Sequence, residues 1–103
     1  MSVKEITTAD FQSEVLDSKG VVALEFWASW CGPCRQFSPI LEQASEQLEG
    51  KVSFLKMNSD ENPEIPAKYR VAGIPTLLIF EDGEYKRSLV GARPLNTLLA
   101  ELN

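Results

Sequence analysis

The 103-residue sequence contains no histidine. This absence removes the imidazole group as a catalytic base, as a metal ligand and as a pH switch near neutrality. Basic residues are also scarce, since 10 Lys and Arg stand against 15 Asp and Glu and leave a net charge of −5. An acidic chain without a cluster of Lys and Arg repels a polyanion, so we expect no nucleic acid partner.

Long apolar runs are missing as well. No stretch approaches the ~20 residues that a membrane-spanning helix needs, so we expect no membrane partner. The segment 1–5 lacks the apolar part of a secretory signal, from which we expect a cytoplasmic protein. With 44% apolar and 24% charged residues and no linker or repeat, the chain is expected to be one domain, residues 1–103, and a monomer.

Only two cysteines occur, Cys31 and Cys34. A disulfide that closes so small a loop stabilises a fold by only about 2 kcal/mol, so chemistry explains the pair better than stability does. Zinc needs four Cys or His ligands, so a metal would have to be shared between chains, and a cysteine protease would lack its histidine base. Dithiol–disulfide exchange needs only the two sulfurs, and the sequence favours it.

Apolar periodicity and chain breakers predict alternating strands and helices. Strands are predicted at residues 3–6, 21–28, 52–58, 76–80 and 85–90. Helices are predicted from Thr7 or Thr8 to Gly20, after Cys34 up to Gly50, from Asn62 to Tyr69, and from Arg93 onward. The fold class is therefore α/β, with a mixed central sheet of about five strands flanked by about four helices. We expect the alternating units to give parallel strands and the hairpin turn at 81–84 to join antiparallel ones.

The two cysteines stand between the end of a buried strand and the first turn of a helix. A helix N-terminus stabilises a thiolate through its free N–H groups and its dipole. The i, i+3 spacing puts both sulfurs on one side, within reach of a disulfide, and Pro33 is tolerated in a first turn. We expect Cys31, further out, to attack a disulfide and Cys34, inside the helix, to resolve the mixed disulfide.

Two charges interrupt otherwise apolar strands, Glu25 and Lys56. Unpaired charges are costly to bury, and adjacent parallel strands would bring these two close together. They form a structural pair on one interpretation, and on another the Lys56 ammonium extends outward to solvent.

The motif Phe26-Trp27-Ala28-Ser29-Trp30-Cys31-Gly32-Pro33-Cys34, followed by Gly73-Ile74-Pro75-Thr76 and Val90-Gly91-Ala92, closely resembles the thioredoxin family. The resemblance covers essentially the whole chain and implies the thioredoxin fold. It also implies a protein-disulfide reductase whose redox group is the Cys31–Cys34 disulfide. The chain has no G-x-G-x-x-G fingerprint, so we expect no bound cofactor and no metal. The Gly32-Pro33 dipeptide favours a reductant, because oxidising relatives often carry His there.

The resemblance further implies partners and roles for residues around the cysteines. Partners would be disulfide-containing proteins and a thioredoxin reductase, NADPH-dependent in preference to ferredoxin-dependent. Pro75 would be a cis proline facing Cys31, although a proline at the start of a strand needs no such role. The backbone of Ile74 would pair with an extended substrate segment. Glu25 stands where thioredoxins typically carry an aspartate thought to move a proton for the resolving thiol; with one methylene more, Glu25 either keeps that role or is structural.

Docking residues complete the expected site. Trp30 is expected to lie exposed beside Cys31, where a flat amphipathic ring suits a docking surface. Gly91 either ends a strand or lets a partner approach closely, and Gly73 is interpreted in the same way. Two other functions stay open. One is an oxidant or isomerase that uses the same cysteines in the opposite direction, and the other is a binding module in which the redox state only gates docking.

Overall fold

The computed structural model describes residues 3–103, so residues 1 and 2 of the predicted domain lie outside the described part. Five strands form one sheet in the order β1-β3-β2-β4-β5. The strands are β1 (Val3–Glu5), β2 (Val21–Trp27), β3 (Val52–Asn58), β4 (Thr76–Glu81) and β5 (Glu84–Val90). The helices are α1 (Gly32–Gln47), α2 (Glu64–Lys68) and α3 (Leu95–Leu102), and two short helical turns, η1 (Thr8–Asp10) and η2 (Gln12–Leu16), follow β1.

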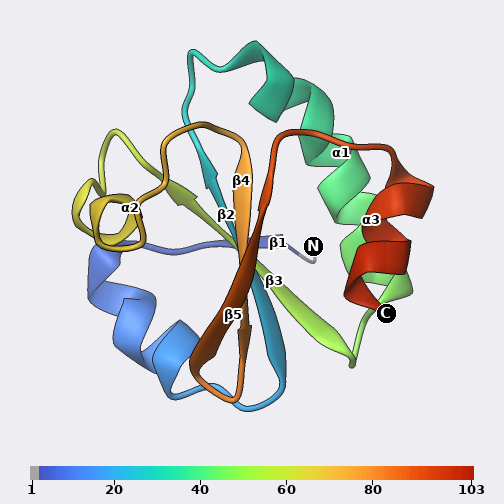
Figure 1. The fold of residues 1–103 in the computed structure, drawn as a ribbon, viewed down its shortest axis with the longest axis horizontal. Coiled ribbons are helices and arrows are strands. Elements are labelled where there is room, and N and C mark those ends of the chain that lie inside the picture. The colour runs from blue at the N-terminus through green and yellow to red at the C-terminus, as the bar shows by residue number, and fades with distance from the viewer. Residues whose placement is uncertain (1–2) are drawn as a thin grey trace.

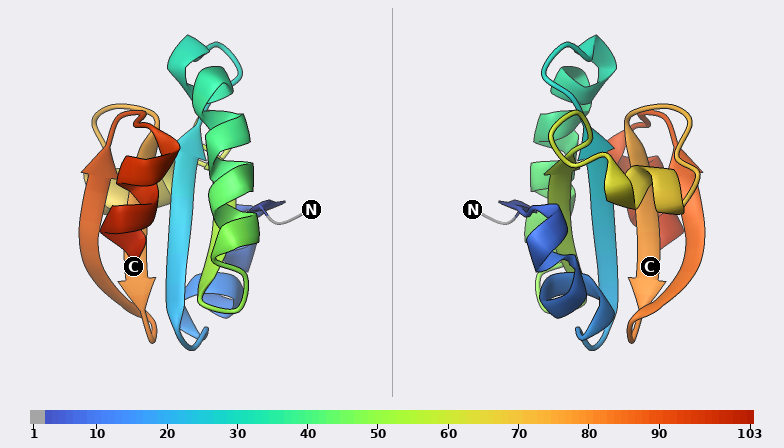
Figure 2. Two further views of the ribbon diagram at one scale, coloured as in Figure 1. Left: turned by 90° about the vertical axis from the view of Figure 1, so that its right-hand side faces the viewer. Right: turned by 90° about the vertical axis from the view of Figure 1, so that its left-hand side faces the viewer.

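The sheet lies between two helical layers (Figures 1 and 2). Helices α1 and α3 cover one face, and η1, η2 and α2 cover the other. Side chains of β2 alternate between the two sides, with Ala23 packed in the α1–α3 layer and Leu24 in the opposite one. A strand that is covered on both faces is a nearly continuous apolar run, as residues 21–27 are. The predicted α/β class with a mixed five-stranded sheet is therefore confirmed.

The direction of β4 corrects one prediction. Strands β1, β3 and β2 are parallel, but β4 runs antiparallel to β2 as well as to β5. The reason is the short helix between β3 and β4. Its five residues rise by ~7.5 Å, whereas the seven-residue strand β3 spans ~23 Å. The connection therefore stays at one end of the sheet, and β4 starts where β3 ends.

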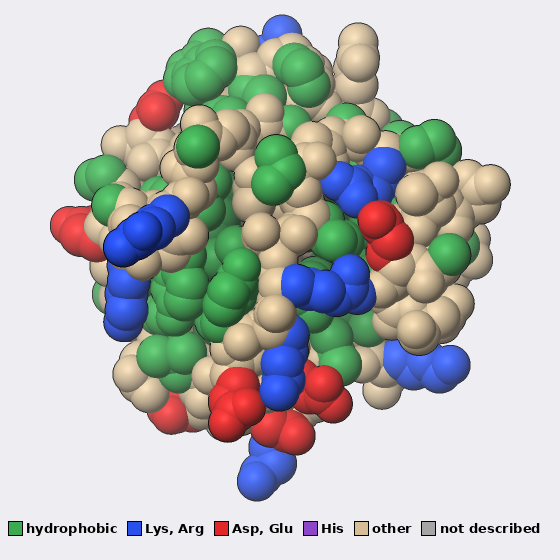
Figure 3. Space-filling model, in the orientation of Figure 1, with side chains coloured by type: hydrophobic (Ala, Val, Ile, Leu, Met, Phe, Trp, Pro, Cys, Tyr) green, Lys and Arg blue, Asp and Glu red, His purple; other side chains and the backbone are tan. Residues whose placement is uncertain are grey.

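The first predicted helix is also corrected, because η1 is a 3-10 turn and η2 a π-type turn. The Asp10 carboxylate accepts the backbone N–H of Thr7 at 2.9 Å and closes the first of these turns tightly. Phe11 and Val15 are nonetheless buried against the sheet. An aromatic cluster of Phe11, Tyr69, Phe80 and Tyr85 continues this layer to the surface between α2 and β5 (Figure 3). Within residues 3–103, no helix is long and apolar enough to cross a membrane.

Candidate active site at the N-terminus of α1

Cys31 is the N-cap residue of α1. It follows the turn that leaves β2, and its Sγ accepts the backbone N–H of Cys34 at 3.1 Å. Pro33 occupies the first turn, where no intrahelical hydrogen bond is lost. The two cysteines form a disulfide with their Cα atoms 5.3 Å apart. The Cys31 sulfur therefore accepts a hydrogen bond from an amide at the positive end of a helix. A thiolate is stabilised at such a position.

Exposure does not separate the two cysteines, contrary to the prediction that Cys31 lies further out. Cys31 is 3% exposed and Cys34 is 4% exposed in the disulfide form. Their surroundings differ instead. The Sγ of Cys31 lies 3.8 Å from the carbonyl oxygen of Ile74, whereas Cys34 lines a cavity of about 280 Å³ that also borders Glu25. Cys31 thus borders the loop before β4, and Cys34 borders a buried carboxyl group.

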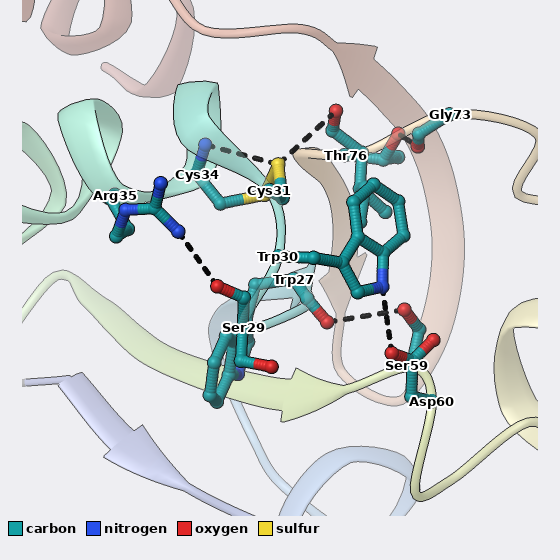
Figure 4. The surroundings of a disulfide bond; sticks show 11 residues. Trp27, Ser29, Trp30, Cys31, Cys34, Arg35, Ser59, Asp60, Gly73 and Thr76 are labelled. Carbon is teal, nitrogen blue, oxygen red and sulfur yellow. Dashed lines mark hydrogen bonds between the residues drawn. A yellow bond between two sulfur atoms is a disulfide. The ribbon is translucent and has the colours of Figure 1, made fainter.

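The loop before α1 is held by two hydrogen bonds that the sequence did not indicate (Figure 4). Arg35 Nη1 donates to the carbonyl oxygen of Ser29 at 2.7 Å, and Trp30 Nε1 donates to Asp60 Oδ2 at 2.8 Å. Trp30 is 67% exposed, as predicted. Asp60 comes just after β3, and the parallel pairing of β2 with β3 puts this loop at the same end of the sheet as Cys31.

The loop before β4 lies on the other side of Cys31. The Ile74–Pro75 peptide bond is cis, as the resemblance implied. The carbonyl oxygen of Pro75 accepts the N–H of Gly91 at 2.8 Å, and Gly91 has a φ of 92°, which favours glycine directly after β5. A groove of about 300 Å³ runs along this loop beside Trp30, lined by Trp30, Ser59, Pro66, Val71, Ala72, Gly73 and Ile74.

Glu25 is buried on β2, with an exposed fraction of 3%. Its Oε2 is the only buried side-chain oxygen or nitrogen without a hydrogen-bond partner in the described part of the chain. Burial raises the pKa of Glu25 to about 7; the positive charge of Lys56 opposes this rise and the negative charge of Glu5 adds to it. A carboxyl group with such a pKa exchanges its proton near neutral pH.

Lys56 pairs in register with Glu25 across β3 and β2, as adjacent strands were expected to place them. No ion pair of 4 Å or less joins the two side chains within residues 3–103. The ammonium instead lies 5.5 Å from the centre of the Trp27 ring. Trp27 and Lys56 both line the cavity beside Cys34. Lys56 therefore stays near the buried acid without neutralising it by direct contact.

The described residues of the site do not form a set of metal ligands. Across residues 3–103, no group of three or more Cys, Asp, Glu or His side chains lies close enough together to hold a metal ion. The redox group is the Cys31–Cys34 disulfide itself.

A disulfide at the N-terminus of a helix, on a mixed sheet and in contact with the loop before β4, defines the chain as a thiol–disulfide oxidoreductase. The sequence model of the family named Thioredoxin matches residues 2–103. A thioredoxin of Rickettsia bellii is 49% identical over 98 residues, covering 95% of this chain and 93% of the relative. A thioredoxin of Pyropia yezoensis is 44% identical over 103 residues, covering 100% and 96%. The chain belongs to the thioredoxin family. Its substrates are disulfide-containing proteins, and a thioredoxin reductase recycles it.

Proposed function

We propose that this protein is a reductant of protein disulfides in which Cys31 attacks and Cys34 resolves. The observation that supports these roles best is the N-cap position of Cys31, whose sulfur accepts the Cys34 amide at 3.1 Å. This contact stabilises negative charge on Cys31 in the reduced protein, and the thiolate is the attacking species.

The exchange proceeds in two displacements. The Cys31 thiolate attacks one sulfur of the target disulfide, forms a mixed disulfide and releases the other target sulfur as a thiolate. Cys34, once deprotonated, attacks the Cys31 sulfur and releases the second target thiolate. The target gains two electrons and the chain loses two, which leaves the Cys31–Cys34 disulfide. The reductase then returns the electrons.

Glu25 is proposed to take the proton of Cys34 during the second displacement. Both residues border one cavity, and burial raises the pKa of Glu25 to about 7. A base with a pKa near the working pH is suited to this transfer. Glu25 is one methylene longer than the aspartate of typical thioredoxins. The cavity of about 280 Å³ that Glu25 and Cys34 both border has room for a water that bridges them.

The groove beside Cys31 is proposed to hold an extended segment of the target. Trp30, Gly73 and Ile74 are among the residues that line this groove. Backbone pairing with a target segment suits many substrates, since it requires no particular side-chain sequence. Gly91 lies beside this loop through its hydrogen bond to Pro75 and would allow a target to approach.

Gly73→Ala tests this docking surface without disturbing the fold. A Cβ atom at Gly73 would meet nothing within 4 Å, so the free protein has room for it. We expect kcat/KM for a protein disulfide to fall several-fold, up to about tenfold, because one displaced backbone hydrogen bond weakens the complex by about 1 kcal/mol. Steady-state kinetics measure the effect, and a small-molecule disulfide, which has no polypeptide to dock, is the control. An unchanged kcat/KM for the protein substrate, with an unchanged melting temperature, argues against docking at Gly73.

The chain would act as a monomer and as one domain over residues 1–103. Its radius of gyration of 12.3 Å, which is that of a compact domain of this length, supports the single domain. The reductase would be NADPH-dependent in preference to ferredoxin-dependent, as the family resemblance suggests. The site of action would be the cytoplasm, where thiols are kept reduced.

The reduction potential of the Cys31–Cys34 couple tests the direction of electron flow. We expect a value near that of thioredoxin, about −270 mV. The measurement equilibrates the protein with defined dithiol buffers and counts free thiols by mass after alkylation. A potential between about −180 and −120 mV would be that of an isomerase or oxidant and would reverse the proposed direction.

A further inference from the structure

Three charged residues form one register row across three neighbouring strands. Glu5 on β1 pairs with Lys56 on β3, and Lys56 pairs with Glu25 on β2. Two residues earlier on each strand, the same face is apolar core under α1: Val3, Phe54 and Ala23. Because strand side chains alternate between faces, the charged row lies on this same side of the sheet. It is the last row that all three strands share; β2 and β3 continue beyond it to the Trp27–Asn58 pair, toward the end of the sheet where the cysteines lie.

Trp27 contacts two members of the charged row, Glu5 and Lys56. Its Nε1 donates to Glu5 Oε2 at 3.3 Å, and its ring lies under the Lys56 ammonium, 5.5 Å from the ring centre. Glu5 is exposed to solvent, whereas Glu25 is buried and its Oε2 has no hydrogen-bond partner. The positive charge of Lys56 is therefore shared between a solvated carboxylate and a buried one.

We propose that Glu5 is a positioning residue that sets the proton affinity of Glu25 by sharing Lys56 with it. The negative charge of Glu5 opposes a second negative charge in the same row. It also attracts the ammonium that would otherwise compensate the buried carboxylate alone. This inference rests on the proposed role of Glu25 in proton transfer. It adds a residue of the edge strand to the machinery around Cys34.

Two other charged residues, Arg35 and Glu61, lie near the charged row. Arg35 on α1 lines the same cavity as Glu25 and Lys56, and Glu61 follows β3 and acts on Glu5. Partial burial raises the pKa of Glu5, while the Trp27 N–H and the charge of Lys56 lower it and favour the carboxylate. Glu5 in turn raises the pKa of Glu25.

The size of the expected effect follows from the sheet. Two inter-strand spacings separate Glu5 from Glu25, which is a distance of about 10 Å. Because Glu5 is exposed, the effective dielectric constant is high, and removing its charge is expected to lower the pKa of Glu25 by about half a pH unit. Salt screens this interaction, so the shift should largely disappear at about 1 M salt.

Glu5→Gln tests the inference, because an amide oxygen can still accept the Trp27 N–H while the charge is gone. We expect the pKa of Glu25, followed by NMR of its 13C-labelled side-chain carboxyl in the oxidised protein, to fall by about half a unit. Glu5→Asp, which keeps the charge, should return the value toward that of the unsubstituted protein. Glu84→Gln is the matched control. It removes one exposed negative charge, from a Lys86 pair at the β4–β5 hairpin, and should leave the pKa of Glu25 unchanged.

The possible outcomes of this experiment separate the inference from its alternatives. An unchanged Glu25 pKa in Glu5→Gln overturns the inference, and so does an equal shift in Glu84→Gln, which would be an effect of net charge alone. The pH profile of substrate reduction then separates this inference from the proposed function. If the pKa of Glu25 falls but the rate profile does not move with it, Glu5 still sets the pKa and the proton-transfer role of Glu25 fails.

Discussion

A Cys34→Ser variant is expected to accumulate as a covalent adduct with its target protein. Cys31 keeps its place at the N-cap of α1 and still attacks the target disulfide. The serine hydroxyl at position 34 cannot attack the mixed disulfide, because the thiolate is the species that carries out exchange. The reaction therefore stops after the first displacement, with one target molecule bound per chain. Turnover should fall to less than about 1% of that of the unsubstituted protein.

Intact-mass spectrometry under non-reducing conditions measures this adduct, which should disappear on addition of a small dithiol. Cys31→Ser is the control, since both variants lose one sulfur and the disulfide. It should form no adduct, because Cys34 borders the cavity of Glu25 and not the docking groove. An adduct with Cys31→Ser and none with Cys34→Ser would reverse the two roles. No adduct with either variant, together with retained binding of partners, would favour a binding module.

Apolar pattern was enough to predict the position of most strands. β3 spans Val52–Asn58 as predicted, and β2 ends at Trp27, one residue before its predicted end. A strand covered on both faces is a nearly continuous apolar run, so the run itself indicates where the strand lies. Strand direction is not encoded in this way. The antiparallel direction of β4 follows from the shortness of α2, which the alternation of predicted strands and helices did not show.

The cysteines, the cis proline and exposed Trp30 were identified from motifs, because each lies in a segment of distinctive sequence. Glu25 and Lys56 were recognised as charges in otherwise apolar strands, but the other residues around the site had no such signal. Glu5 is one charge in a short edge strand, where charged residues are ordinary. Its connection to Glu25 appears only once β1, β3 and β2 are placed in register. Likewise, the part of Asp60 in holding the loop before α1 is recognised only from its hydrogen bond with Trp30.

Glu25→Gln is expected to stabilise the protein above neutral pH. In the folded chain, burial raises the pKa of Glu25 to about 7, against 4.5 for the same group in water. Below pH 4.5 the carboxyl group is protonated in both the folded and the unfolded state and has no effect on the balance between them. As pH rises from 4.5 to about 7, the unfolded state loses this proton first, so the free energy of unfolding decreases.

Above about pH 7 the buried carboxylate is ionised in both states, and its cost is fully present. A pKa rise of this size lowers the free energy of unfolding by about 3 kcal/mol once the carboxyl group is ionised. Gln at position 25 does not ionise, so the variant avoids this loss. The variant should thus gain about 3 kcal/mol over the unsubstituted protein between pH 4 and pH 8. Because Glu25 is 3% exposed, solvent screens little of this difference.

Guanidinium unfolding of the oxidised proteins at pH 4 and pH 8 measures this gain, with the disulfide intact so that neither cysteine titrates. Glu84→Gln serves as the control, since an exposed ion pair such as that of Glu84 with Lys86 contributes at most about 1 kcal/mol, so this variant should differ little from the unsubstituted protein. If Glu25→Gln differs from the unsubstituted protein by the same amount at both pH values, the carboxyl group of Glu25 does not titrate with a raised pKa. The stability curve would then contradict the proton affinity on which the role of Glu25 beside Cys34 depends.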